Sequence, residues 1–378
     1  MLHTPRHLSL PMRLDARKCL IDALIGRPCN TIESEDAAAV LGTAQREGVV
    51  ALIEKQWASH PENAPTSGPL RMAFAEATRR QAACLLWIRA EAQRLLTELH
   101  AQGVQVLVLK GVALGDWLYP ETYLRASNDL DVLVASAEDA QRASEILAGL
   151  GFAAGYVQGR HAYERLCEST SATSPRLEVD LHWRLLNAPV FAQALMFRDL
   201  WQDSIPLPGL GSQAWGLCPV HALVHAAMNR VVNLYTGVGD LLKCLYDIHV
   251  LIAQLDAEDW THVVELCSRA GLCGVVHSAL EAARKELRTD VPSEILHALE
   301  QRACLEKLKP AMLSDWRYMQ RQNLRALPWQ ARPSWLWERL FPDPTYLQHS
   351  EGAEKSLARQ RLSRIKRLWR RMKPGLRE

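Results

Sequence analysis

A strand-like apolar run that begins with two carboxylates constrains this chain more than any other feature of its sequence. The run reads DLDVLV at residues 129–134, with Asp129 and Asp131 at alternate positions. Side chains alternate between the faces of a strand, so both carboxylates point one way while Leu130 and Val132 point into the core. Like charges this close repel unless a cation lies between them, and hard cations such as Mg²⁺ prefer oxygen ligands. The pattern predicts a metal site; equally, one Asp could cap the preceding turn, since ASND is good capping chemistry.

A third carboxylate occurs in a second apolar strand context. Asp180 lies within LEVDLHW at residues 177–183, flanked by apolar side chains. Core strands rarely contain carboxylates without a partner, so we expect Asp180 to join the pair as a third ligand. His182 comes two residues later and shares the face of Asp180. We expect it to orient Asp180 or a backbone group, with contact to a phosphate as the alternative.

The segment before the carboxylates has the features of a phosphate cradle. Lys110 and Gly111 lie where the apolar run VQVLVLK gives way to the helical pattern GVALGDWLY. Gly111 would let the backbone approach a phosphate at the positive end of that helix. Arg125 could pair with phosphate oxygens through its planar guanidinium group. Lys110 would add positive charge, although a lysine at the end of a strand is often a solvated edge residue.

The order of these motifs resembles the nucleotidyltransferase fold of the DNA polymerase beta superfamily. More narrowly, VLVLKGVALGDWLYPETYLRASNDLDVLV followed by EVDLHWRL is similar to a bacterial family of uncharacterised nucleotidyltransferases, over about residues 85–190 and more weakly beyond. The resemblance implies that Asp129, Asp131 and Asp180 are the catalytic residues and bind two Mg²⁺ ions. It also implies that Gly111 approaches the triphosphate of a bound nucleotide.

The function implied by this resemblance is transfer of a nucleoside monophosphate from a nucleoside triphosphate (NTP) to a hydroxyl or similar group of an unidentified acceptor. Lys110, Arg125 and His182 would contact the phosphates. Val112 follows Gly111 where the wider superfamily usually has Gly or Ser. A catalytically degenerate module that binds a nucleotide or a partner protein is therefore the alternative. A haloacid dehalogenase phosphatase also has a DxD, but there the aspartates end an apolar strand, whereas here they begin one.

The apolar periodicity predicts an α+β fold with a mixed-sheet core of the nucleotidyltransferase type, flanked by helices. We expect strands at 104–110, 129–134 and 176–186, with helical patterns before, between and after them. The expected domains are a helical N-terminal region (1–80), the nucleotidyltransferase α/β core (81–210), a helical domain (211–310), and a Trp/Pro-rich segment with a basic amphipathic C-terminal helix (311–378).

Three further polar residues lie in helical patterns of the 211–310 region. His221 and His225 have the HxxxH spacing of a metal site, but no glutamate follows His221 and no third ligand is evident, so we expect structural roles. Asp247 is an acid within the apolar stretch LYDIHVLI. For it we expect a buried hydrogen bond between helices, with a place on the cleft wall as the alternative.

Charge and cysteine content limit the partners and the compartment. The formal net charge is only +2, which argues against nucleic acid as the main substrate. Nine dispersed cysteines without a CxxC pair, and the lack of a signal-like or long apolar stretch, predict a cytoplasmic protein with reduced thiols. Basic charge is concentrated in EKSLARQRLSRIKRLWRRMK at residues 354–373. This helix could contact the inner face of a membrane, an acidic partner or nucleic acid, or it could dock its apolar side on the protein.

Overall fold

The computed structural model describes residues 15–28, 32, 34–65, 67–153, 156–157, 159–170, 177–344, 362–364 and 366. The chain forms two compact units, the first ending at Arg79 and the second beginning at Arg80. Helix α4 (Gly68–Ala101) contributes residues to both. Most of the predicted basic C-terminal helix lies outside the described residues. The domain limits expected at 210 and 310 stay predictions.

The first unit is helical, as its sequence pattern indicates. It contains α1 (Ala16–Leu24), α2 (Ser34–Glu47), α3 (Val50–Ser59), the short 3-10 helix η1 (Pro61–Asn63) and the start of α4. Asp15 begins α1 by accepting a hydrogen bond from the backbone of Lys18 at 3.1 Å, which satisfies one free N–H of the first turn. Trp57 of α3 packs on Phe74 of α4, with ring centroids 4.7 Å apart.

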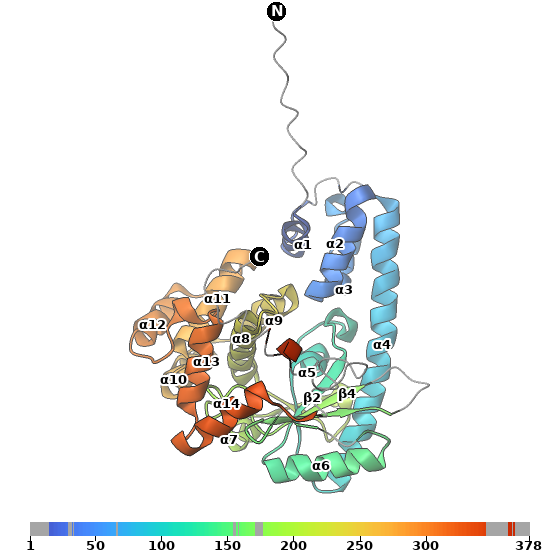
Figure 1. The fold of residues 1–378 in the computed structure, drawn as a ribbon. Coiled ribbons are helices and arrows are strands. Elements are labelled where there is room, and N and C mark those ends of the chain that lie inside the picture. Colours follow the sequence, from blue (N-terminus) through green and yellow to red (C-terminus); the bar gives the residue numbers. More distant parts are fainter. Residues whose placement is uncertain are drawn as a thin grey trace, which may run out of the picture. The chain divides into compact units, whose positions relative to one another are not determined.

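The second unit contains a six-stranded mixed sheet with the order β3-β4-β2-β1-β6-β5, of which Figure 1 labels β2 and β4. Its strands are β1 (Leu107–Val108), β2 (Asp129–Leu133), β3 (Glu164–Glu168), β4 (Glu178–His182), β5 (Ile205–Pro206) and β6 (Trp215–Gly216). β2 runs parallel to β4, and β1 runs parallel to β6. The remaining neighbours, β1 with β2, β3 with β4 and β5 with β6, are antiparallel. The predicted α+β class with a mixed sheet is confirmed.

Helices surround this sheet and continue after it. They are α5 (Lys110–Trp117), α6 (Ala137–Gly149), α7 (Phe197–Gln202), α8 (Pro219–Thr236), α9 (Leu242–Ile252), α10 (Ala257–Ala270), α11 (Cys273–Leu287), α12 (Ser293–Ala303), α13 (Trp316–Ala326) and α14 (Arg332–Leu340), with 3-10 helices η2 (Thr122–Leu124), η3 (Pro208–Leu210), η4 (Pro310–Met312) and η5 (Trp329–Ala331). Among the described helices, none combines the length and apolarity needed to cross a bilayer.

Side chains along β2 alternate between the two faces of the sheet, so the strand contributes to the apolar core on one face and presents Asp131 on the other. Leu130 and Val132 are buried in the same apolar cluster as Ala140 and Ala143 of α6. Figure 1 shows α6 on one side of the sheet and α5 on the opposite side. Asp131 alternates with the two core residues and therefore faces α5. This alternation places the Asp131 carboxylate beside the apolar core, on the α5 side of the sheet, and not within the core.

The observed strands are shorter and more numerous than the sequence pattern indicates. Of the expected strand 104–110, β1 includes only Leu107 and Val108, and the expected strand 176–186 is confined to β4. The sequence analysis did not predict three of the strands, which are β3, β5 and β6. The sequence of β3 is ERLCE, whose charged side chains lack the apolar alternation of a half-buried strand. β5 and β6 have two residues each, too few for any periodicity.

The cysteines agree with the expected thiols at most described positions. The free ones are Cys84, Cys167, Cys218, Cys244, Cys267, Cys273 and Cys304. The expectation of reduced thiols is wrong at Cys19, which is disulfide-bonded.

Candidate active site

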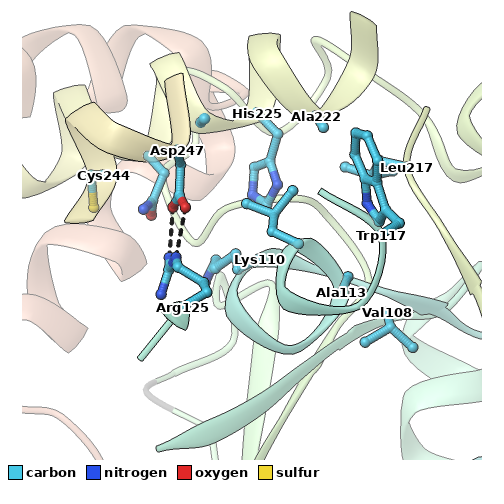
Figure 2. Close-up of a pocket in the computed structure, with 13 residues that line it drawn as sticks. Val108, Lys110, Ala113, Trp117, Arg125, Leu217, Ala222, His225, Cys244 and Asp247 are labelled. Atoms are coloured by element: carbon cyan, nitrogen blue, oxygen red, sulfur yellow. Dashed lines mark hydrogen bonds and ion pairs between the residues drawn. The ribbon is translucent and has the colours of Figure 1, made fainter. Parts of the chain in front are cut away.

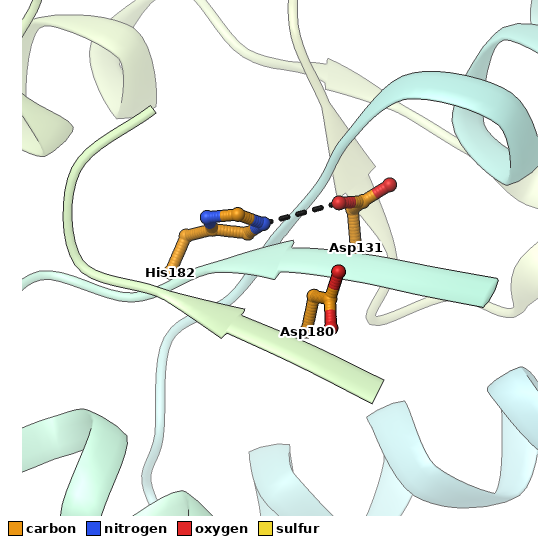
Figure 3. Close-up of side chains that lie close together, drawn as sticks. All are labelled: Asp131, Asp180 and His182. Carbon is orange, nitrogen blue, oxygen red and sulfur yellow. Dashed lines mark hydrogen bonds and ion pairs between the residues drawn. The ribbon is translucent and has the colours of Figure 1, made fainter. Parts of the chain in front are cut away.

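Two neighbouring parallel strands bring the acidic residues together. In the register of β2 with β4, Asp131 is the partner of Asp180, and Leu133 is the partner of His182. Residues paired across parallel strands share a face, so Asp131, Asp180 and His182 project together. One carboxylate oxygen or ring nitrogen from each lies within 4.8 Å of the others (Figure 3). Among the described residues, this is the group of three whose atoms could ligate one metal ion.

A lysine ammonium already engages this group. Lys110 Nζ lies 2.6 Å from Asp131 Oδ1, and His182 Nε2 lies 3.0 Å from the same oxygen. Lys110 is the first residue of α5 and has a backbone φ of +49°, a conformation that residues other than glycine rarely adopt. Strained backbone of this kind persists only where surrounding contacts hold it. Lys110 is therefore not a solvated edge residue in this structure, because its ammonium is bound to the acidic group.

The acidic residues differ in their electrostatic environment. Burial alone would raise the pKa of Asp131, but the charge of Lys110 and the hydrogen bond from His182 lower it well below its usual value. Burial would likewise lower the pKa of Lys110, but attraction by Asp131 raises it. For Asp180, burial and the neighbouring charge of Asp131 raise the pKa to about 7. Asp131 is thus compensated, whereas Asp180 makes no ion pair with any of the described residues.

The donor set fits a divalent cation. Within the described part of the chain, Asp180 Oδ1 and His182 Nδ1 are buried without a hydrogen-bond partner. His182 Nδ1 is 3.7 Å from Glu164 Oε2, beyond hydrogen-bond length. A buried carboxylate oxygen without a partner is costly, and a metal ion would satisfy it. Two carboxylates and an imidazole are common ligands of divalent metals.

Asp129 occupies a different position from the other two predicted ligands. It is half-buried, and its Oδ1 accepts a hydrogen bond from Ser127 Oγ at 3.1 Å. This contact matches the turn-capping alternative for one Asp of the pair. Asp129 lies outside the group of three whose ligand atoms converge. Its role as a metal ligand stays a prediction.

Gly111 permits a close approach of α5 to the loop before β2. A Cβ added at this position would collide with Ser127 Oγ, lying 2.8 Å from Ser127 Cβ and 3.3 Å from Arg125 Nη1. The predicted need for glycine is therefore explained by the protein's own loop. The side chain of Val112, the departure from the wider superfamily, packs in the apolar core.

Arg125, predicted to contact phosphate, makes a buried ion pair instead. Its Nε and Nη2 donate to the two carboxylate oxygens of Asp247 in α9, at 2.6 and 2.7 Å. Nη1 donates to the carbonyl of Ala126. The hydroxyl of Tyr119 donates to Asp247 at 2.7 Å. Asp247 thus makes the buried hydrogen bond that the sequence indicated, but its partners lie in the segment before β2 and not on a neighbouring helix.

A pocket lies beside Lys110, between α5 on one side and α8 and α9 on the other (Figure 2). Its lining residues are Val108, Lys110, Ala113, Leu114, Trp117, Arg125, Leu217, Ala222, His225, Ala226, Asn229, Cys244 and Asp247. Its cavity volume is about 40 Å³, and the unfilled space reaches about 490 Å³ when open solvent at its mouth is counted. Sequence reasoning singled out Lys110, Arg125, His225 and Asp247, with a place on the cleft wall as the alternative for Asp247, but it did not predict that they line one pocket, because they are far apart in the chain. His221 does not line it, so the two histidines of the HxxxH pattern have different surroundings.

Comparison with known proteins found a matching family and a similar solved structure. A family described as "Uncharacterised nucleotidyltransferase" matches residues 33–288. A solved structure, described as that of an antigenic nucleotidyltransferase-like protein from Paracoccidioides brasiliensis, is similar with a TM-score of 0.31 and 14% identity, over 55% of this chain and 96% of that one. No curated protein matches. Because the family match covers more than half of the chain, including the converging Asp131, Asp180 and His182, the protein belongs to the uncharacterised nucleotidyltransferase family.

Proposed function

We propose that the protein is a metal-dependent nucleotidyltransferase, which transfers a nucleoside monophosphate from an NTP to a hydroxyl or similar group of an acceptor. The observation that supports it most is the pairing of Asp131 with Asp180 on adjacent parallel strands, with His182 beside them. Membership of the nucleotidyltransferase family supports the class of reaction. The relation of this fold to the DNA polymerase beta superfamily, and a bacterial origin of the chain, are part of the proposal.

The proposed reaction exchanges one phosphorus–oxygen bond for another. The acceptor oxygen forms a bond to the α-phosphorus of the NTP, and the bond from that phosphorus to the bridging α–β oxygen breaks. Pyrophosphate leaves with the electron pair, and the acceptor hydroxyl gives up its proton to water. Such transition states need positioning and positive charge more than covalent participation by the protein. The residues of the site are suited to those two tasks.

Asp131, Asp180 and His182 would hold the catalytic divalent cation, for which we propose Mg²⁺. When bound, such a cation neutralises triphosphate charge and lowers the pKa of an attached hydroxyl. The proposed second ion would use Asp129, the remaining carboxylate of β2. The unpartnered Asp180 oxygen supports this assignment, because a bound cation would compensate it.

Lys110 and the N-terminus of α5 would hold the phosphates. The ammonium of Lys110 has donors to spare beyond its bond to Asp131. No described side chain caps the first turn of α5, which would add backbone N–H groups and the positive end of the helix. Arg125 is already bound to Asp247, so we assign it the task of fixing the loop before β2.

The test is pyrophosphate release from each of the four NTPs with Mg²⁺, in the presence of a fractionated small-molecule extract that supplies acceptors. We expect Mg²⁺-dependent release by the native protein and loss of at least about a hundredfold in Asp131→Asn and Asp180→Asn. Asp290→Asn, at an exposed position, is the matched control. Thermal unfolding verifies that the variants are folded.

Two outcomes of this test contradict transfer. Retained release in Asp131→Asn or Asp180→Asn would remove the carboxylates from the mechanism. NTP binding without release, across all acceptor fractions, would support the degenerate nucleotide-binding alternative.

Location and further partners are also proposals. We propose that the protein acts in the cytoplasm and that residues 354–373 contact an anionic membrane surface or an acidic partner. The density of Lys and Arg in this segment supports such contact.

A further inference from the structure

The pocket beside Lys110 has the shape of a slot between two helices. Ala113 of α5 faces it from one side, and Ala222 and Ala226 of α8 face it from the other. Protein interiors are normally close-packed, and larger side chains at these positions would fill the gap. Leu114 and Trp117 of α5 contribute further apolar side chains to the lining of the slot. Small residues on both helices therefore leave a narrow gap that is lined mainly by apolar side chains.

A buried histidine in this slot lacks one hydrogen bond. His225 is 3% exposed, and its Nε2 has no partner among the described residues. Burial and the charge of Lys110 lower the pKa of His225 to about 3, so the ring is neutral. We assign the proton to Nδ1, because the backbone of Leu185 raises the pKa of the ring, as a carbonyl that accepts a hydrogen bond from Nδ1 would do. Nε2 is then a free acceptor. Figure 2 shows the ring projecting from α8 toward α5 and Lys110.

Two more polar groups belong to the same lining. Trp117 Nε1, which can only donate, is buried without a partner in the described part of the chain. Asn229 lies one helical turn after His225 and supplies an amide, which can both donate and accept. Buried polar groups normally have partners, so the unmet acceptor and donor indicate a ligand that supplies both.

The charges of the slot are arranged at one end. Lys110 stands where the slot meets the metal-ligating group. Arg125 and Asp247, which also line the pocket, neutralise each other. A ligand that fits this distribution has an anionic end near Lys110 and a flat uncharged part inside. A nucleotide has this form, with its phosphates at one end and its base at the other.

We infer that the slot between α5 and α8 binds the base of the nucleoside triphosphate, and that an N–H on the edge of the base donates to His225 Nε2. This inference rests on the proposed function, and it makes His225 a specificity-determining residue. Trp117 Nε1 and the Asn229 amide would donate to acceptor atoms of the same base. A pocket for the acceptor molecule is the competing reading, and the experiment below separates the two.

The experiment compares the binding of Mg²⁺-NTPs with the binding of Mg²⁺-tripolyphosphate, by calorimetry without any acceptor. If the slot holds the base, at least one NTP binds about tenfold or more tightly than tripolyphosphate. His225→Phe keeps the apolar volume but removes the acceptor, so it should weaken that NTP about fivefold or more and leave tripolyphosphate unchanged. His221→Phe makes the same change one turn earlier on α8, outside the slot, and should leave the NTP preference intact.

A second variant guards against misfolding of His225→Phe. Ala226→Leu fills the slot and should remove most of the preference for the NTP over tripolyphosphate, while Mg²⁺ binding persists. Equal binding of NTPs and tripolyphosphate by the native protein would overturn the inference. So would a preference that survives both variants. In either case, binding that requires Mg²⁺ and Asp131 would leave the proposed function standing, whereas no binding of any NTP would overturn both.

Discussion

Lys110 Nζ lies 2.6 Å from Asp131 Oδ1, so the protein's own cation occupies one side of the carboxylate that we assign to a metal ion. The pair joins the first residue of α5 to the middle of β2. A divalent cation must share Asp131 with this ammonium group. The contact keeps the carboxylate ionised and reduces the negative charge that a metal ion would meet.

Removing the lysine charge should therefore separate metal binding from nucleotide binding. In Lys110→Gln we expect Mn²⁺ or Mg²⁺ alone to bind about three- to tenfold more tightly, because a competing positive charge is gone. The same variant should bind NTP more weakly, because a phosphate contact is lost. Calorimetry with metal alone and then with NTP measures both, and Lys285→Gln, at an exposed position, is the control. Weaker metal binding in Lys110→Gln would contradict this reading of the pair.

Metal affinity should depend on pH through Asp180. Its pKa is about 7 in the metal-free protein, so a proton competes with the metal at and below that pH. We expect affinity to rise as the pH increases to about 7 and to level off above it. Proton release on binding, measured in buffers of different ionisation enthalpy, should be largest below pH 7. Affinity that is flat between pH 5.5 and 8 would contradict the assignment of Asp180 as a ligand.

Asp180 should also make the free energy of unfolding depend on pH, in the opposite direction from a carboxylate that forms an ion pair. The pKa of Asp180 is raised to about 7 in the folded state, from about 3.9 in an unfolded chain. Its contribution to stability is thus present at low pH and is lost as the pH rises through 7. Without metal, Asp180→Asn should raise the free energy of unfolding by about 1–2 kcal/mol at pH 8, and by much less at pH 5. Urea unfolding at both values measures this, and destabilisation by Asp180→Asn at pH 8 would contradict it.

The buried pair of Arg125 with Asp247 should dominate the stability of the second unit near the site. Asp247→Asn leaves a buried guanidinium without its counter-charge, and we expect a loss of about 3–5 kcal/mol in urea unfolding. The double variant Arg125→Met with Asp247→Leu should recover much of it, because no buried charge remains. Glu281→Gln breaks an exposed ion pair with Arg284 and should cost less than about 1 kcal/mol. A small effect of Asp247→Asn would show that water reaches the pair.

Gly111 should tolerate a side chain only when its neighbour is reduced. Gly111→Ala forces α5 away from Ser127, and we expect a loss of about 1–3 kcal/mol together with lower NTP affinity. Ser127→Gly in the same chain removes the obstructing atoms and should restore part of the loss. Gly42→Ala, in a helix with only ordinary contacts around it, should be neutral or stabilising. Equal effects at the two glycines would contradict the steric explanation.

The sequence predicted those parts of the fold and site that depend on local patterns. Alternation in DLDVLV and EVDLHW identified β2, β4 and the shared face of Asp180 and His182. A lysine before glycine at a strand-to-helix junction marked the start of α5. These signals survive because strand pleat and helix period are properties of the backbone.

Pairings between distant residues could not be predicted in the same way. Arg125 was expected to bind phosphate because it lies shortly before the aspartates of β2. Its actual partner, Asp247, lies 122 residues later in the chain, and no local pattern links the two. The slot around His225 depends on which faces of α5 and α8 meet, a matter of tertiary packing. β3 was not predicted because its charged residues interrupt the alternation of apolar and polar side chains that identifies a strand.

The most direct test of the account is anomalous diffraction from crystals grown with Mn²⁺ and an NTP. If Asp131 and Asp180 share a metal ion, an anomalous peak should lie between β2 and β4, about 2.0–2.3 Å from carboxylate oxygens of both residues. The triphosphate should lie between this peak and the N-terminus of α5. A structure with NTP and Mn²⁺ bound elsewhere, or with the two carboxylates free of metal, would contradict it.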